Sequence, residues 1–469
     1  MIAPNDVVEN GSSLYSPFIL PFIGYTKMVE HKEAWLRHKH GLPELDSRMR
    51  AHDDPVGLTK ALTVSHLTWG STNVIAGTAD DQMVVSSGKE VERWQKGERN
   101  YVRYQSKDLN RGKFTLYSGR YGIARNHQAR VPVTAYYHEP HMANVEPMMG
   151  HLANALTYYE EAFGPYPYDE VRLAEFAYYP GMVFSEGGTI GLPEVLGWKA
   201  DLTGEGEDAM IGWISYLLAH VWWEDQIIVA DVAGGMSVRE ALSGYASNLY
   251  RQQIYDDARY QRVKQKQLRD YFRALGQVDF VEPALDNVYN EVLPARFKGQ
   301  MVLEQIESQI GRPALLAAIG DFHNQFKGKP APYATLPDLT EAIVQHTPPN
   351  LRGRVAELFE SVITYRFGVL DAVAQLGESG YQVELMVEAQ KLYTRELGEQ
   401  KPEVMDWPLT LVVEDREGNV IYESELLMTA EQQSIELNLA AEPFRVRLDP
   451  HLSLPGPITP NRDRRVRVI

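Results

Sequence analysis

One histidine on an apolar stretch of chain raises the question of metal chemistry. The stretch ISYLLAHVWWEDQ, residues 214–226, contains His220 and no second histidine. In a helix, side chains four residues apart share a face, so the pattern His-Glu-x-x-His lets two imidazoles hold one zinc ion. The glutamate of that pattern serves as general base to the metal-bound water. Here Tyr216 stands at the first histidine position and Leu217 at the glutamate position, so the pattern has lost a ligand and the base.

The same stretch also has a structural interpretation. Leucine can neither accept a proton nor orient a water molecule, and a catalytic zinc ion needs three protein ligands. Apolar residues occur nearly all round the expected helix, as in a helix buried within a core: Met210, Ile211, Trp213, Ile214, Leu217, Leu218, Val221 and Trp222. For His220 taken alone, we therefore favour a buried structural histidine over a metal ligand.

The composition is that of an ordinary globular protein, with 44% apolar and 23% charged residues. A chain of 469 residues is too long for one core and implies several domains. The absence of cysteine excludes disulfides, thiolate zinc sites and cysteine nucleophiles. The net charge of -17 opposes binding to nucleic acid, and we expect no nucleic-acid partner.

The sequence contains no apolar run near the roughly 18 to 20 residues that cross a bilayer. Its first residues lack the basic and apolar regions of a signal peptide. We therefore expect either a cytosolic protein or a soluble part of something larger.

The hydrophobic period divides the chain into three parts. Residues 1–140 alternate apolar and polar positions and predict a β-rich domain, with strands expected at 62–69, 81–87, 100–106, 113–124 and 131–138. Residues 141–365 are mainly helical, with two strands at 171–178 and 188–193 and helices expected at 142–163, 207–227, 237–254, 258–275, 299–311, 313–325, 336–346 and 351–361. Alternation returns over 366–469 and predicts a β-sandwich with a tight hairpin at its Gly-Asn pair. The predicted fold class is α+β and multidomain.

Several ordered motifs resemble the aminopeptidase N family of zinc metallopeptidases, the gluzincins. They cover roughly residues 100–469 and are GRYGIA before VTAYYHEPHMANVE, FGPYPYDEVRLAEF, LLAHVWWED and REALSGYASNLY. In particular, the chain is similar to the subgroup fused behind the membrane segments of an ABC-transporter permease. The resemblance implies a partial, saddle-like N-terminal sheet, a thermolysin-like helical domain and a C-terminal β-sandwich.

Position by position, the resemblance places degenerate residues in the zinc site. Tyr216 replaces the first zinc histidine, Leu217 replaces the general base, and His220 matches the second histidine. Glu240 matches the third ligand, one residue further along than is typical of the family. Glu240 also fits a capping box that begins at Ser237, and we expect either role or both.

Two further features of the family lie outside the segments that contain His220 and Glu240. In PARFKGQ, Arg296 replaces the tyrosine that helps to stabilise the tetrahedral intermediate. An arginine can still donate hydrogen bonds to an oxyanion, but its positive charge would oppose metal binding. Glu186, in a Ser-Glu-Gly-Gly turn, matches the glutamate that holds the free amino group of the substrate. The alternative, which we favour, is an acidic turn residue between two short strands.

The leading hypothesis is therefore a catalytically inactive, aminopeptidase-like domain without a cofactor. The resemblance implies an extracytoplasmic, periplasmic part of a bacterial ABC-transporter permease that binds a peptide, a protein or the transporter segments themselves. A second hypothesis is an active zinc aminopeptidase that uses His220, Glu240 and a third ligand, for which His151 and His127 are available. A third is a purely structural spacer domain.

Overall fold

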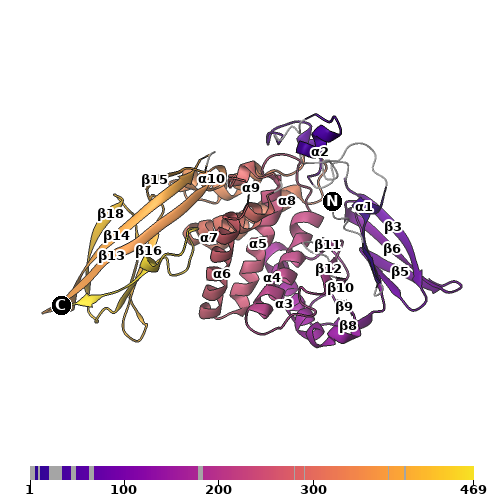
Figure 1. Cartoon of the computed structure of the whole chain (residues 1–469), viewed down its shortest axis with the longest axis horizontal. Coiled ribbons are helices and arrows are strands. Elements are labelled where there is room, and N and C mark those ends of the chain that lie inside the picture. Colours follow the sequence, from indigo (N-terminus) through magenta and orange to yellow (C-terminus); the bar gives the residue numbers. More distant parts are fainter. Residues whose placement is uncertain are drawn as a thin grey trace. The chain divides into compact units, whose positions relative to one another are not determined.

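Figure 1 shows the computed structural model of the chain, an α+β protein with more than one domain. The structure describes residues 6–8, 11–20, 34–43, 49–62, 68–177, 183–278, 280–289, 291–378, 380–395 and 398–469. It divides into two compact units, the first formed by Met1–Ile254 with Leu316–Ile343 and the second by Tyr255–Leu315 with Val344–Ile469. The three-part division by sequence pattern stays a prediction, because these units group residues by proximity in space.

The described residues of the first unit form three sheets. Their strand orders are β1-β2-β7-β4, β3-β6-β5 and β11-β12-β10-β9-β8. The strands are β1 Asp6–Val8, β2 Gly11–Tyr15, β3 Gly70–Ala79, β4 Met83–Ser86, β5 Lys89–Gln95, β6 Arg99–Asn110, β7 Thr115–Gly119, β8 Gly122–Asn126, β9 Val133–Tyr137, β10 Val171–Phe176, β11 Phe184–Glu186 and β12 Thr189–Pro193. Of the strand expected at 62–69, residues 63–67 lie outside the described part of the chain.

The five-stranded sheet of the first unit positions much of the candidate chemistry. Its three inner strands, β9, β10 and β12, run parallel and are buried along their whole length. Strands covered on both faces are mostly apolar, as TIGLP is, whereas VRLAEF also buries the charged residues Arg172 and Glu175. The edge strands β8 and β11 pair antiparallel to their neighbours, and Glu186 is the last residue of β11.

Three helices of the first unit, α3, α4 and α5, pack against one another. They extend over Val145–Phe163, Glu205–His220 and Gly235–Ile254, and a π-helical turn, η4, follows α4 over Val221–Asp225. The aromatic pair of the opening motif packs on the end of α3: the Phe163 ring lies 6.4 Å from Trp222 and 5.2 Å from Trp223 between centroids. The apolar character of residues 210–223 therefore reflects a core position.

The shorter elements of the first unit are α1 Ser16–Ile19, α2 Ala34–Lys39 and the 3₁₀ turns η2 Gly57–Thr59 and η3 Glu139–Asn144. Helices α8 Arg312–Phe326 and α9 Leu336–Gln345 fall mainly in this unit. Within the described residues, no helix combines the length and apolar character needed to cross a membrane.

In the described part of the second unit, helices are combined with two sheets. Its helical elements are α6 Asp257–Leu275, η5 Leu285–Asn287, η6 Pro294–Lys298, α7 Gly299–Ile310, α10 Arg352–Glu360 and η7 Pro460–Arg462. One sheet has the order β15-β14-β13-β21, with β18 also paired to β14, and the other has the order β17-β16-β19-β20. The strands are β13 Ile363–Gly377, β14 Gly380–Thr394, β15 Gln400–Val404, β16 Leu409–Glu414, β17 Val420–Leu426, β18 Gln432–Leu439, β19 Arg445–Leu448, β20 Asp463–Arg465 and β21 Arg467–Val468.

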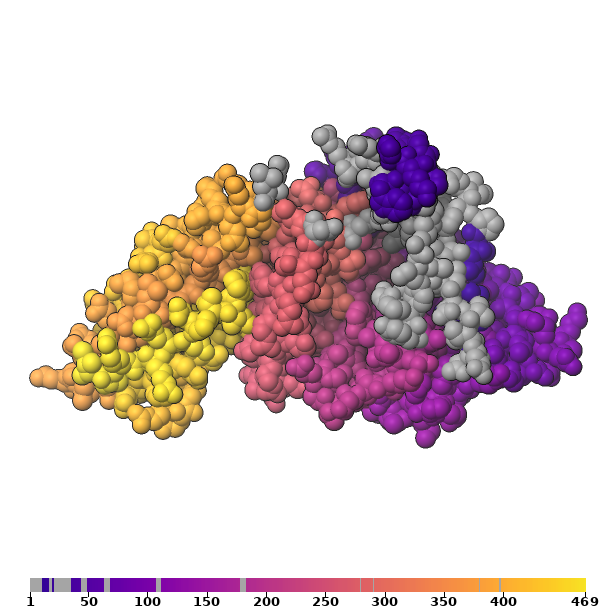
Figure 2. Space-filling view, viewed as in Figure 1, coloured from indigo at the N-terminus to yellow at the C-terminus, as the bar shows by residue number. Residues whose placement is uncertain are grey.

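In Figure 2 the strand-rich C-terminal part of the second unit is coloured orange to yellow. Strands β16 and β17 form the hairpin expected from the sequence. Asp415 and Asn419 close its loop with a backbone hydrogen bond of 2.9 Å. Gly418 adopts a φ of +89° there, a conformation that glycine reaches without steric cost.

Candidate functional site

Helices α4 and α5 bring together three of the residues singled out by sequence. Tyr216 and His220 lie one turn apart on α4, with ring centroids 4.6 Å apart. The Tyr216 hydroxyl donates a hydrogen bond to Oε2 of Glu240 on α5. All three side chains are buried. The positions that correspond to three zinc ligands in the resemblance therefore form one cluster in this fold, which we call the Tyr216–Glu240 cluster.

The extra residue between His220 and Glu240 coincides with a local distortion. The turn η4 begins directly after His220 and is π-helical. A π turn holds one residue more than an α turn, because its hydrogen bonds connect residues five apart. The longer spacing therefore does not prevent Glu240 from facing Tyr216.

The capping-box interpretation of Glu240 is wrong. Helix α5 begins at Gly235, so Ser237 lies inside the helix and its amide donates to the carbonyl of Gly234 at 3.0 Å. The carboxylate of Glu240 points instead to Tyr216 and to Arg239.

Arg239, whose side chain is 14% exposed, supplies a positive charge at the Tyr216–Glu240 cluster. Its Nη2 donates to Oε1 of Glu240 at 2.6 Å, and its Nη1 lies 3.3 Å from Oε2 of Glu224. The same oxygen of Glu224 lies 3.0 Å from Nδ1 of His220. Both oxygens of Glu240 are thus occupied, and Nε2 of His220 is buried without a hydrogen-bond partner among the described residues.

A second set of ion pairs extends the network toward β11. Oε1 of Glu224 accepts from Nη2 of Arg111 at 2.9 Å and from Nζ of Lys113 at 3.2 Å. The Lys113 ammonium also lies 2.5 Å from Oε2 of Glu186, and the two side chains are 1% and 6% exposed. The carboxylate that the resemblance assigns to a substrate amine is therefore paired with an ammonium of the protein itself.

Charge and burial set the protonation of these acids. Burial, the largest single effect, would raise the pKa of Glu224 and of Glu240, but the charge of Arg239 together with the other cations and hydrogen bonds around each acid holds both pKa values below the ordinary one. Asp225 behaves differently, because burial and then the charge of Glu186 raise its pKa to about 8. It accepts hydrogen bonds from Tyr168 at 2.9 Å and from the amide of Gly187 at 3.1 Å.

The residues at the Tyr216–Glu240 cluster do not fit a zinc ion. A catalytic zinc needs three protein ligands, whereas Glu240 is engaged by Arg239 and Tyr216, and only Nε2 of His220 remains. The guanidinium charge of Arg239 would also repel the ion. Leu217 is 1% exposed within the core and offers no base.

The other histidines considered from the sequence do not complete the site. His151 lies 3.1 Å from the Tyr250 hydroxyl, and His127 is exposed just after β8. Among the described residues, neither belongs to a group of potential metal ligands with His220. Arg296 belongs to the second unit, in η6, where its guanidinium lies 5.2 Å from the Phe297 ring centroid.

Sequence reasoning missed the charges that fill this site. Glu224 lies directly after the Trp-Trp pair and Arg239 directly before Glu240, so charged residues flanking an apolar helix were a usable signal. Arg111 and Lys113 are more than 100 residues from Glu224 in the chain, and no local pattern connects them with it.

Comparison with known proteins supports the fold through a solved structure of low sequence identity. No family model matches the chain, and no curated protein matches it. Its structure is similar to the crystal structure of Legionella pneumophila aminopeptidase A in complex with aspartic acid, with a TM-score of 0.58 and 15% sequence identity. The similarity covers 83% of this chain and 44% of the Legionella chain, so this chain spans less than half the length of that protein. We conclude that the chain has a peptidase-like fold.

Proposed function

We propose that the chain is a catalytically inactive, aminopeptidase N-like module that serves as a binding or scaffold part of a larger protein. The observation that carries the proposal is the contact of Arg239 with Glu240 at 2.6 Å. This contact places a fixed positive charge where the resemblance requires a zinc ion. Leucine at position 217 removes the general base as well.

The position that binds the substrate amino group in the aminopeptidase N family supports the same proposal. An aminopeptidase must bind the free amino group of its substrate, and Glu186 corresponds to the residue for that task. The buried ion pair between Lys113 and Glu186 competes with such binding. A peptide would have to displace an internal ammonium that is 1% exposed, so a partner of this module binds through other groups.

The setting of the module is inferred from the sequence resemblance. The permease-fused subgroup supports an extracytoplasmic position beside ABC-transporter segments. The net charge of -17 favours a protein or peptide partner over nucleic acid.

Hydrolysis of aminoacyl p-nitroanilides, measured with and without added zinc, tests the inactivity. We expect the wild-type chain to show no more hydrolysis than a His220→Ala variant. Zinc-dependent hydrolysis that His220→Ala abolishes would establish the active aminopeptidase instead.

Affinity capture from native membranes tests the binding role. The immobilised chain should enrich transporter segments or another defined protein over a folded, acidic control protein of similar size. A spacer domain should enrich nothing beyond that control.

A further inference from the structure

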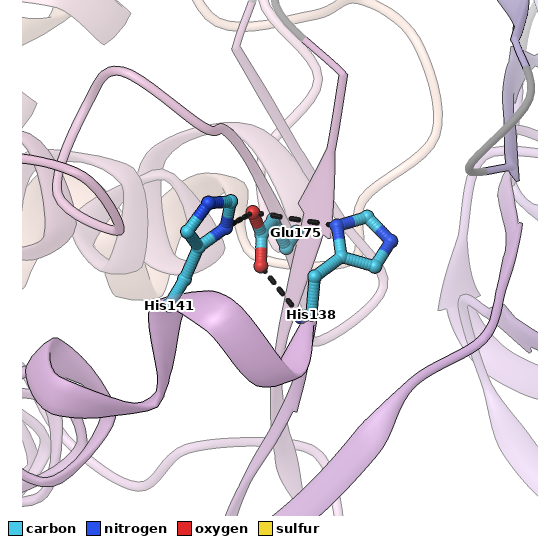
Figure 3. A group of neighbouring side chains, drawn as sticks. All are labelled: His138, His141 and Glu175. Atoms are coloured by element: carbon cyan, nitrogen blue, oxygen red, sulfur yellow. Dashed lines mark hydrogen bonds and ion pairs between the residues drawn. The ribbon is translucent and has the colours of Figure 1, made fainter.

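A histidine–histidine–glutamate cluster lies in the first unit, apart from the residues discussed above. Figure 3 shows His138, directly after β9, and His141, on the turn η3, both directed toward Glu175 on β10. One potential ligand atom from each residue lies within 4.8 Å of the other two. The cluster shares no residue with the Tyr216–Glu240 cluster.

The ligand atoms converge on one carboxylate. Nδ1 of His141 contacts Oε1 of Glu175, and Nδ1 of His138 lies 3.4 Å from the same oxygen. The other oxygen, Oε2, accepts from the backbone amide of His138 at 2.7 Å. This last bond fixes the carboxylate orientation and leaves Oε1 directed at both imidazoles.

The surrounding structure holds each ligand in place. His138 is the extended residue directly before the 3₁₀ turn η3, His141 lies within that turn, and the backbone amide of His141 donates to the carbonyl of His138 at 2.8 Å. The ring of His138 stacks on Tyr121 at 5.2 Å between centroids, and the Tyr121 hydroxyl donates to the backbone carbonyl of Glu175 at 2.8 Å. In metal sites, contacts of this kind between a ligand and its neighbours hold the ligand in the orientation that binds the metal.

Burial makes a positive partner necessary. The Glu175 side chain is 0% exposed, whereas the side chains of His138 and His141 are 12% and 13% exposed. A buried carboxylate is costly unless it is paired with a cation or a metal. Among the described residues, the ion-pair partners of Glu175 are these two histidines, while Lys199 pairs with Glu194 at 2.6 Å.

We propose that His138, His141 and Glu175 bind a divalent transition-metal ion, with zinc as the preferred ion. Two imidazole nitrogens and one carboxylate oxygen are a ligand set that zinc accepts, and its tetrahedral preference leaves a fourth position for water or an external ligand. The partial exposure of both rings gives the ion access from solvent. The ion would tie η3, and with it the start of α3, to the middle sheet strand β10.

Metal binding to the whole chain provides the test, with Zn²⁺ and Co²⁺ alone as probes. After equilibrium dialysis, we expect about one zinc per chain by elemental analysis and the visible absorption of tetrahedral cobalt. Loss of a residue that only supports a metal ligand typically weakens metal binding by roughly 10- to 100-fold. His141→Ala and Glu175→Gln each remove a ligand itself, so each should weaken zinc binding by more than that.

Matched variants separate this site from the Tyr216–Glu240 cluster. His220→Ala and His151→Ala should bind zinc as the wild type does. His141 is partly exposed, so its variant keeps the fold, which circular dichroism checks, even if Glu175→Gln does not. Absence of zinc from the wild type, equal binding by His141→Ala, or loss of binding in His220→Ala would each overturn the proposal.

Discussion

At the scale of single residues, Arg239 decides the chemistry between α4 and α5. It compensates Glu240 and Glu224 at once; both carboxylates are buried, and the Arg239 side chain is 14% exposed. A buried ion pair adds little net stability compared with apolar residues in its place. Removal of one partner, however, leaves the other charge buried without a counter-charge. The same guanidinium therefore prevents metal binding and is required by the carboxylates around it.

Arg239→Ala should destabilise the chain by about 3 to 5 kcal/mol, because it leaves two buried carboxylates without their arginine. Urea denaturation measures the effect. Arg120→Ala is the matched control: its ion pair with Asp81 is about half exposed on both sides, and its loss should cost under about 1 kcal/mol. Similar losses in both variants would contradict the buried network.

Asp225 should make stability fall as pH rises. Its pKa of about 8 in the folded chain lies above the ordinary 3.8, so between these values the folded state holds a proton that the unfolded state lacks. The stabilising contribution is complete below about pH 4 and is lost as pH rises through about 8, by at most about 1.4 kcal/mol per pH unit. Asp225→Asn cannot titrate.

The stability of Asp225→Asn relative to wild type should therefore increase from pH 6 to pH 9. Urea midpoints of both proteins across this range measure it. If the urea midpoints of the two proteins changed with pH in parallel, Asp225 would have an ordinary pKa in the folded chain.

Restoration of the zinc helix should require removal of Arg239. We expect Tyr216→His with Leu217→Glu to bind no zinc at this position, and the same pair with Arg239→Ala to bind it, because Glu240 is then released. Elemental analysis in a His141→Ala background excludes the second site. Equal zinc binding with and without Arg239 would show that its charge is not the obstacle.

At the scale of elements, close packing of neighbouring strands fixes the five-stranded sheet. Gly191 on β12 lies so near the buried Tyr117 of β7 that a Cβ there would approach the tyrosine hydroxyl to 1.9 Å and Cζ to 2.5 Å. Since β12 pairs with β11, this contact also supports the strand that carries Glu186. The glycine is required here by space rather than by backbone conformation.

Gly191→Ala should destabilise the chain by about 1 to 3 kcal/mol through overpacking. Gly150 provides the control, because it lies in α3 with open space around its Cβ position. Gly150→Ala should stabilise the chain by roughly 0.5 to 1 kcal/mol. Thermal denaturation compares the two, and addition of Tyr117→Phe should recover part of the Gly191→Ala loss.

At the scale of the whole molecule, the chain forms two units between which it passes three times, after Ile254, Leu315 and Ile343. Each unit has its own core. Trp222 and Trp223 are buried in the first unit, and Trp407 is buried in the second. Proteins with several cores commonly depart from two-state unfolding.

Calorimetry should therefore resolve two unfolding transitions. Arg239→Ala should lower the transition of the first unit, and Trp407→Ala should lower the other, since loss of a buried tryptophan costs about 3 to 5 kcal/mol. If both variants shift a single common transition, the two units unfold cooperatively.

The sequence by itself determined many of the elements, although no strand was expected at β3 or β5. The helix expected at 258–275 is α6, Asp257–Leu275, and the strand expected at 188–193 is β12, Thr189–Pro193. Such agreement follows because hydrophobic period and turn residues act over a few neighbouring positions. The loss of the general base at Leu217 could likewise be recognised from the sequence, since it depends on residue type alone.

Only the tertiary structure decided what occupies the candidate site. The approach of Arg239 to Glu224, the contact of Tyr216 with Glu240 and the pairing of Lys113 with Glu186 depend on helix and strand packing. The convergence of His138 and His141 on Glu175 likewise results from the parallel pairing of β9 with β10. Electrostatic contacts form between residues that are close in space, and the sequence carries no local record of partners that lie tens of residues apart.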